Sequence, residues 1–98
     1  MTADTVIGTA NHKAPGGLLR AKITVDHEKI SDIVLSGDFF LYPSDSIRTL
    51  EENLIGASVE GEDIVNRVRE TYKDFNIDSP GVTPEDFETV IKLSLEQK

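Results

Sequence analysis

The chain has 98 residues, ten of them basic and eighteen acidic, and its formal net charge is −8. This charge argues against nucleic acid and anionic membranes as partners. No apolar run reaches the roughly 18 residues that a membrane-spanning helix needs. The absence of cysteine excludes disulfides, thiolate metal sites and a cysteine nucleophile. It also favours a cytoplasmic location, because small secreted domains are usually cross-linked.

The charges are unevenly distributed along the sequence. Lys13, Arg20 and Lys22 fall within ten residues, and no acid occurs from residue 14 to residue 25. Acids gather later, at residues 51–52 and 60–63. A basic front half fits the binding of an anionic small molecule or of a complementary protein surface. The alternative is an ordinary solvated exterior.

The first half of the chain is predicted to form strands. Residues 1–12 show no clear period and are expected to be an N-terminal tail or a short edge strand, and residues 15–17 are a Pro-Gly-Gly loop. Residues 18–26 alternate between apolar and polar, which is typical of a half-buried strand. A polar break at residues 27–29 and an apolar run at residues 30–36 then predict a hairpin.

The segment Ser-Gly-Asp-Phe-Phe-Leu-Tyr-Pro that follows holds three of the six aromatic residues. Its Gly-Asp pair can turn the backbone sharply, and residues 39–42 are expected to form the third strand of an antiparallel meander. Successive side chains of a strand point to opposite faces. One of Phe39 and Phe40 is therefore expected in the core, and the other either under a helix or in a protein interface.

The second half is predicted to form helices, the first of which opens after Pro43. Ser44 or Asp45 is expected to cap its free N–H groups. Ile47, Leu50 and Leu54 follow at helical spacing. Gly56 is well placed as the residue just past the C-terminus of this helix.

Two further helices are predicted. The second spans residues 62–72. The third starts at Thr83-Pro84, with Thr83 as N-cap and proline in the first helical position. Its buried stripe is expected to comprise Phe87, Val90, Ile91 and Leu95. Strands followed by helices indicate an α+β domain, in which about three helices pack on one face of a three-stranded antiparallel meander.

No catalytic constellation and no metal site are visible in the sequence. His12 and His27 flank the first predicted strand at opposite ends and are expected to be exposed loop residues. The acidic run at residues 60–63 lacks the ligand spacing of an EF-hand loop. Acids at the start of a helix explain it more simply.

Four residues are candidates for binding. Lys13, with the backbone N–H groups of Gly16 and Gly17, could face an anion, or the segment could be a flexible loop with a solvated lysine. Asp38 could orient a lysine or a ligand, or it could simply form the turn that follows Gly37.

These residues resemble, as a set, the accessory domain of lipoate–protein ligase. The resemblance rests on Lys-Ala-Pro-Gly-Gly-Leu-Leu-Arg at residues 13–20, Gly-Asp-Phe-Phe at residues 37–40 and Leu-Glu-x-x-Leu-x-Gly at residues 50–56. It covers residues 13–98. In many bacterial ligases this domain is the C-terminal part of one chain, and the present sequence looks like the stand-alone small subunit of archaeal two-subunit ligases.

The resemblance implies a function and a fold. A larger catalytic subunit would hold lipoate and ATP, form lipoyl-AMP with magnesium, and transfer the lipoyl group to a lysine of an acceptor lipoyl domain. This chain would be an accessory subunit needed for the activation step, with no cofactor of its own. The implied fold is similar to the scaffold domains of iron–sulfur assembly (SufE/NifU-like), although a chain without cysteine cannot hold a cluster in their way.

Site residues follow from the same resemblance together with charge and turn chemistry. Lys13, Gly16 and Gly17 are expected near the substrate anions, and Asp38 with the Phe39–Phe40 pair at the contact with the larger subunit. The alternative function is a non-catalytic protein-binding scaffold module in metabolic protein assembly. A self-contained enzyme is disfavoured, because neither a catalytic triad nor a metal set is present.

Overall fold

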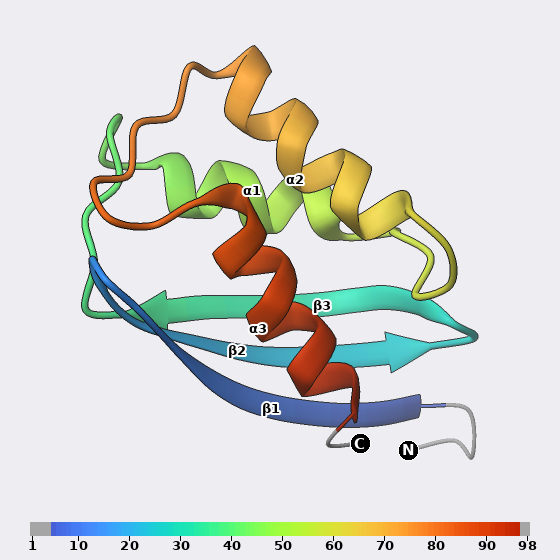
Figure 1. Ribbon diagram of the computed structural model, residues 1–98. Helices are drawn as coiled ribbons and strands as arrows, with labels where there is room; N and C mark the ends of the chain where they lie inside the picture. Colours follow the sequence, from blue (N-terminus) through green and yellow to red (C-terminus); the bar gives the residue numbers. More distant parts are fainter. Residues whose placement is uncertain (1–4, 97–98) are drawn as a thin grey trace.

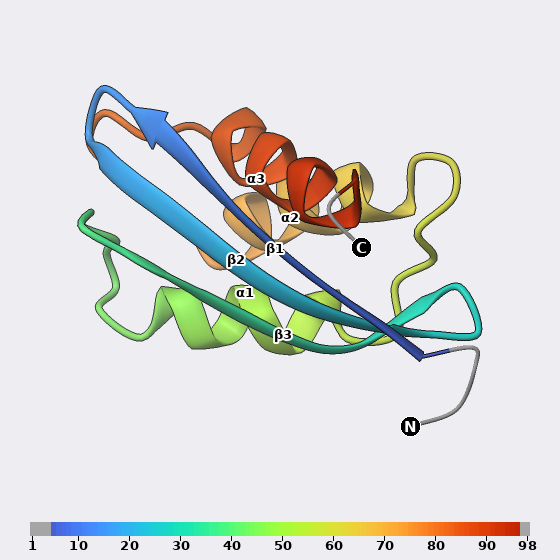
Figure 2. The same cartoon turned by 90° about the horizontal axis from the view of Figure 1, so that it is seen from below.

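A computed structural model describes residues 5–96, which form three strands followed by three helices (Figure 1). The elements are β1 (Thr5–Ala14), β2 (Gly17–Asp26), β3 (Lys29–Gly37), α1 (Ser46–Leu54), α2 (Asp63–Asp74) and α3 (Pro84–Glu96). The strands form one antiparallel sheet in the order β1-β2-β3. The helices all lie on one side of it, with α3 over β1 and β2 and α1 beside β3 (Figures 1 and 2). The predicted α+β class is therefore confirmed.

The central strand shows why the sheet has one covered face. Leu19, Ala21, Ile23 and Val25 of β2 are all buried against the helices, whereas Arg20 and Lys22 between them are exposed. The alternation predicted for this strand is confirmed. The hairpin that leads to β3 turns at His27 and Glu28, which both have positive φ, as a two-residue hairpin turn requires.

The first strand is longer than its sequence suggests. Of residues 1–12, expected to be a tail or a short edge strand, residues 1–4 lie outside the described residues. Residues 5–12 belong to the ten-residue edge strand β1, which continues through the following two residues. Its inward residues are Val6, Gly8, Ala10, His12 and Ala14, and all but Val6 are small or polar, with α3 packed above them. An inward face with a single large apolar residue gives no clear period-2 signal, so the sequence pattern does not predict the full strand.

The third strand predicted at residues 39–42 is wrong. After Gly37 the chain leaves the sheet, and Asp38 N–H donates to Leu18 O at 2.9 Å. Only Tyr42 forms a bridge, exchanging two 2.8 Å hydrogen bonds with Asp78 in the loop before α3. The side of β3 that this segment would have needed is already occupied. Ile30 there pairs with the backbone of residues 56–57, and Leu35 N–H donates to the Glu51 carboxylate of α1 at 2.7 Å.

The sequence predicts three helix ends in detail, and the structure confirms two of these predictions. Gly56 follows α1 with φ of +89°, as expected for a residue that must adopt positive φ. At α3, Thr83 Oγ1 accepts from Asp86 N–H and Asp86 Oδ2 accepts from Thr83 N–H, a reciprocal cap. The cap predicted for α1 is wrong, because the Asp45 side chain makes no capping bond. The backbone O of Asp45 instead accepts from the N–H groups of Arg48 and Thr49.

The core lies between the sheet and the three helices. Phe87 of α3 is its largest fully buried side chain, and Val90 and Ile91 extend the same buried stripe. Leu95, predicted to complete that stripe, is partly buried against the core. Phe39 meets the Phe87 ring edge-on, with the ring centroids 5.6 Å apart.

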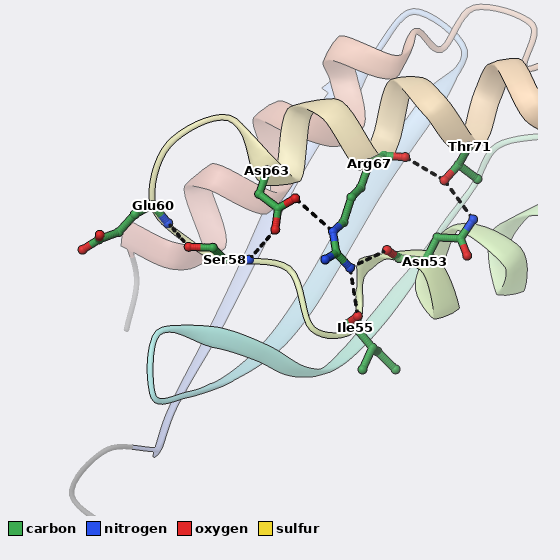
Figure 3. Close-up of polar contacts among 7 residues, drawn as sticks. All are labelled: Asn53, Ile55, Ser58, Glu60, Asp63, Arg67 and Thr71. Carbon is green, nitrogen blue, oxygen red and sulfur yellow. Dashed lines mark hydrogen bonds and ion pairs between the residues drawn. The ribbon is translucent and has the colours of Figure 1, made fainter.

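A guanidinium group joins α2 to the end of α1 (Figure 3). Arg67 Nη1 donates to Asn53 O at 3.3 Å and to Ile55 O at 3.1 Å, and these carbonyls have no partner within the helix. Arg67 Nε donates to Asp63 at 3.1 Å, and the same carboxylate accepts from Ser58 N–H at 2.8 Å. Arg67 and its partner Asp63 therefore link the end of α1, the connector at Ser58 and the first turn of α2.

Replacing Arg67 by methionine keeps most of the aliphatic stem and removes these hydrogen bonds. We expect Arg67→Met to lower the free energy of unfolding by about 1–2 kcal/mol, because charged donors to otherwise unpaired carbonyls are lost. Thermal unfolding should show a fall in Tm of about 4–8 °C per kcal/mol. The exposed Lys73 on the same helix supplies the control, Lys73→Met. Equal Tm values for the two variants would contradict this role of Arg67.

Candidate functional site

Three segments that are distant in sequence meet at one end of the sheet. They are the β1–β2 turn at Pro15 and Gly16, the end of β3 with residues 37–40, and the loop before α3 at Pro80 and Gly81 (left side of Figure 1). The first of these segments contains the predicted Gly16–Gly17 pair, and the second contains Asp38, Phe39 and Phe40. The structure therefore brings the two predicted groups of site residues together.

Glycine permits the close approach of these segments. A Cβ atom on Gly17 would overlap the carbonyl oxygen of Asp38, and one on Gly37 would overlap the carbonyl oxygen of Leu18. Gly17 has φ of +141° and Gly37 has φ of +147°, which L-residues rarely adopt. On the other side of the turn, a Cβ atom on Gly16 would overlap the Pro80 carbonyl oxygen. The segments at this junction therefore contact one another through backbone atoms.

The predicted anion-binding group is only partly available at this end. The N–H of Gly16 donates to Gly81 O at 2.8 Å, so it is used within the fold and does not face solvent as a free donor. Lys13 is exposed on β1, opposite Leu18, on the uncovered face of the sheet. Asp38 is exposed beside the turn. Of the predicted residues, Lys13 and Asp38 are thus the charged groups that are exposed at this end.

The two phenylalanines have different environments. Phe39 is partly buried and packs on Phe87, whereas Phe40 is 68% exposed. Tyr42, two residues on, is 53% exposed. The question that the sequence left open is thereby answered: Phe39 belongs to the core and Phe40 is exposed.

A groove of about 260 Å³ lies beside these aromatic residues, between the end of β3 and the start of α1. Leu35, Phe39, Leu41 and Ile47 contribute its apolar lining, and Ser36, Gly37 and Ser44 the remainder. We call the groove, Phe40 and Tyr42 together the aromatic end. Protruding aromatic side chains beside an apolar recess are typical of the centre of a protein interface.

Sequence reasoning missed a polar contact behind this end. His12 was expected in an exposed loop, but it lies on the inward face of β1, and its Nε2 is 2.9 Å from Asp86 Oδ1. Asp86 also caps α3 through Thr83. The Thr-x-x-Asp spacing signalled the cap, but the histidine could be found only once residues 5–14 were known to form a strand.

The Asp86 carboxylate is stabilised in its charged form. Burial alone would raise the pKa of Asp86, but hydrogen bonds from Thr83 N–H, from His12 and from the Thr83 hydroxyl outweigh it and hold the pKa below its ordinary value. The charge therefore belongs to the joint between β1 and α3. No reactive role is needed to explain it.

The remaining candidates have structural explanations. His27 Nδ1 lies 2.7 Å from the neighbouring Asp26 carboxylate. Within the acidic run, Asp63 stands in the first turn of α2 and accepts from Ser58 N–H and from Arg67, which lower its pKa. Over residues 5–96, no three His, Cys, Asp or Glu residues are grouped to hold a metal ion. In the same range no helix is long and apolar enough to cross a membrane.

The fold and the site define a class: a small α+β module with an exposed aromatic end. Residues 9–91 match the family model described as bacterial lipoate protein ligase C-terminus. The chain is 40% identical over 83 residues to lipoate-protein ligase A subunit 2 of Thermoplasma acidophilum, which covers 85% of each chain.

A solved structure agrees with this match. It comes from an archaeal lipoylation system, described as a bi-partite lipoate protein ligase and its E2 lipoyl domain, also from Thermoplasma acidophilum. The TM-score is 0.83 at 40% identity, and the alignment covers 89% of the present chain and 96% of the other. The chain belongs to the family of the lipoate protein ligase C-terminal domain.

The glycine junction gives a first test at this site. We expect Gly17→Ala to be strongly destabilising, by more than about 2 kcal/mol, because the new methyl group adds a clash with the Asp38 carbonyl to the cost of positive φ. Gly61→Ala is the matched control, since Gly61 also has positive φ but nothing lies within 4 Å of its Cβ position. Chemical denaturation measures both. A Gly17 variant no less stable than the Gly61 variant would refute the clash.

The pH dependence of stability gives a second test. Because the pKa of Asp86 is lowered by folding, its contribution is present above the ordinary aspartate value of 3.8 and is lost as the pH falls through the folded-state pKa. Denaturation of the wild type between pH 2 and 6 should therefore show a fall in unfolding free energy at the acid end. That fall should be smaller in Asp86→Asn.

The control for this measurement is Asp45→Asn, because Asp45 makes no side-chain capping bond. Its curve should stay parallel to that of the wild type. An Asp86→Asn curve that also runs parallel to the wild type would show that the Asp86 contacts do not contribute to stability.

Proposed function

We propose that this chain is the accessory subunit of a two-subunit lipoate–protein ligase, acting in the cytoplasm with a larger catalytic subunit. In this complex ATP and lipoate are converted to lipoyl-AMP, and the lipoyl group then passes to a lysine of an acceptor lipoyl domain. The single observation that supports the proposal best is the 40% identity, over 85% of both chains, to the second subunit of a lipoate-protein ligase.

The proposal assigns the substrates to the larger subunit. Among residues 5–96, no group of acids and histidines offers a magnesium site. The groove at the aromatic end, about 260 Å³, is smaller than the roughly 300–1,000 Å³ of typical ligand pockets. ATP, magnesium and lipoate would therefore bind in the partner's pocket. The small subunit would order that pocket and exclude water from it, which aligns two anions without a catalytic base of its own.

The aromatic end is the proposed contact with the larger subunit. Phe40 and Tyr42 expose rings that a partner could bury, and the groove beside them could accept a side chain in return. Asp38 lies next to these rings at the rim. Phe39 acts indirectly, because its packing on Phe87 fixes the backbone that carries Phe40.

Lys13 is the proposed substrate-proximal residue. It is exposed near the end of β1 that leads into the β1–β2 turn, close to Gly17 and Asp38 at the same end of the sheet. Its ammonium group could reach an anion at the edge of the partner's pocket. The roles of Gly16 and Gly17 are then to hold this end together, since the Gly16 N–H is bonded within the chain. A fold relationship to iron–sulfur scaffold domains remains part of the proposal.

The test is pyrophosphate release from ATP and lipoate, measured with the larger subunit alone, with this chain alone and with both. We expect release only when both are present. Turnover by this chain alone, or full activity of the larger subunit without it, would contradict the proposal. A stable complex with unchanged rates would favour the alternative, a protein-binding scaffold module.

Variants then separate the two roles. Phe40→Ser should weaken the complex by about 30-fold or more if Phe40 is an interface anchor. Phe75→Ser, at the 50% exposed ring after α2, is its control and should not weaken the complex.

Lys13→Ala should slow pyrophosphate release at a saturating concentration of the larger subunit, while leaving the affinity between the subunits unchanged. Unchanged release and affinity in both Lys13→Ala and Asp38→Ala would remove the assigned roles.

A further inference from the structure

The uncovered face of the sheet carries a charge opposite to that of the whole molecule. Lys13 of β1 and Arg20 and Lys22 of β2 project from this face, because their strand neighbours point toward the helices. The formal charge of the chain is −8, so the other residues together carry −11. Asp32 lies at the other end of the face, opposite Thr24. The basic residues Lys13, Arg20 and Lys22 thus run from the aromatic end to the middle of the face.

This face is also shaped to make contact. A shallow hollow of about 280 Å³ lies between the strands, and Arg20 and Lys22 line it together with Val34. Val34 is 48% exposed and stands directly across from Lys22 in the register. Arginine is enriched in protein interfaces, whose cores are apolar and whose rims are polar, and Arg20 beside the exposed Val34 fits this composition.

We propose that this face, defined by Arg20, Lys22 and Val34, docks an acidic surface of the larger catalytic subunit. The proposal rests on the function proposed above, because it takes the larger subunit as the partner. It adds the chemistry of recognition: the partner must offer carboxylates to the two β2 cations and an apolar side chain to the hollow.

The charge distribution favours a folded protein over other anionic partners. Nucleic acid is a continuous polyanion, and a site of two or three cations within a strongly acidic molecule would be surrounded by repulsion. The same argument disfavours an anionic membrane. A protein can place its acids opposite Arg20 and Lys22 and its own basic or neutral residues opposite the remaining surface, which makes the potentials complementary.

The face and the aromatic end can form one continuous footprint. Three strands about 4.8 Å apart and about 33 Å long give a projected area of about 480 Å², of the same order as the roughly 800 Å² that each partner buries in a standard interface. Ser36 lines both the groove of the aromatic end and the hollow on the face, so the two surfaces adjoin. The aromatic end would add to the area that the face supplies.

The experiment measures the association rate of this chain with the larger subunit by stopped flow at about 20 and about 200 mM salt. The test variant is Arg20→Gln/Lys22→Gln. The control is Lys73→Gln/Lys92→Gln, which takes two exposed lysines from α2 and α3 and brings the formal charge from −8 to the same −10. Matched thermal unfolding shows that each variant is folded.

We expect the wild-type association rate to fall by about tenfold over this salt range, and the test variant to associate about fivefold more slowly at low salt with a flatter salt dependence. The control should stay within about twofold of the wild type. A complex that forms with the same rate and salt dependence in the test variant would overturn the docking proposal and leave the accessory function intact. The docking proposal would also be overturned if the test variant slowed association only with the isolated acceptor lipoyl domain and not with the larger subunit. If the wild type formed no complex with the larger subunit, both the docking proposal and the accessory function would be contradicted.

Discussion

The close contact between two turns at one end of the sheet is the constraint on which the rest of the structure depends. Gly17 lets the start of β2 lie against the Asp38 carbonyl, Gly37 lets the end of β3 lie against the Leu18 carbonyl, and Asp38 N–H is bonded to Leu18 O. From this junction the chain leaves the sheet, and the position of Phe39 on Phe87 follows. The backbone that carries the exposed ring of Phe40 is therefore held by the core, which would lower the entropy lost in the subunit contact proposed above.

Sequence reasoning succeeded where a side-chain pattern and a burial requirement coincide. The alternation of β2, the stripe of α3 and the glycine after α1 were all readable, because each reflects a local rule. It failed at β1, whose inward residues Gly8 and Ala10 are small because a helix lies directly above them. Small inward residues are a consequence of tertiary packing, so no local pattern reports them.

The candidate site was predictable in its parts and not in its assembly. The Gly-Gly loop and the Gly-Asp-Phe-Phe block were both singled out, but their contact depends on three strands being in register. The Gly16 N–H illustrates the same limit: a donor that looks free in the sequence is bonded to Gly81, which lies 65 residues further along the chain. The choice between Phe39 and Phe40 needed the position of Phe87, because either ring satisfies the alternation of an isolated strand.

The bond between Leu35 N–H and the Glu51 carboxylate has a consequence for the unbound protein. The edge strands of two molecules can pair when one of them offers free backbone N–H groups to the other. At β3 the partly buried Glu51 carboxylate already accepts from one of those amides, and its charge would repel the carbonyl oxygens of a second molecule. This edge of the sheet is therefore less open to pairing with a second copy of the chain.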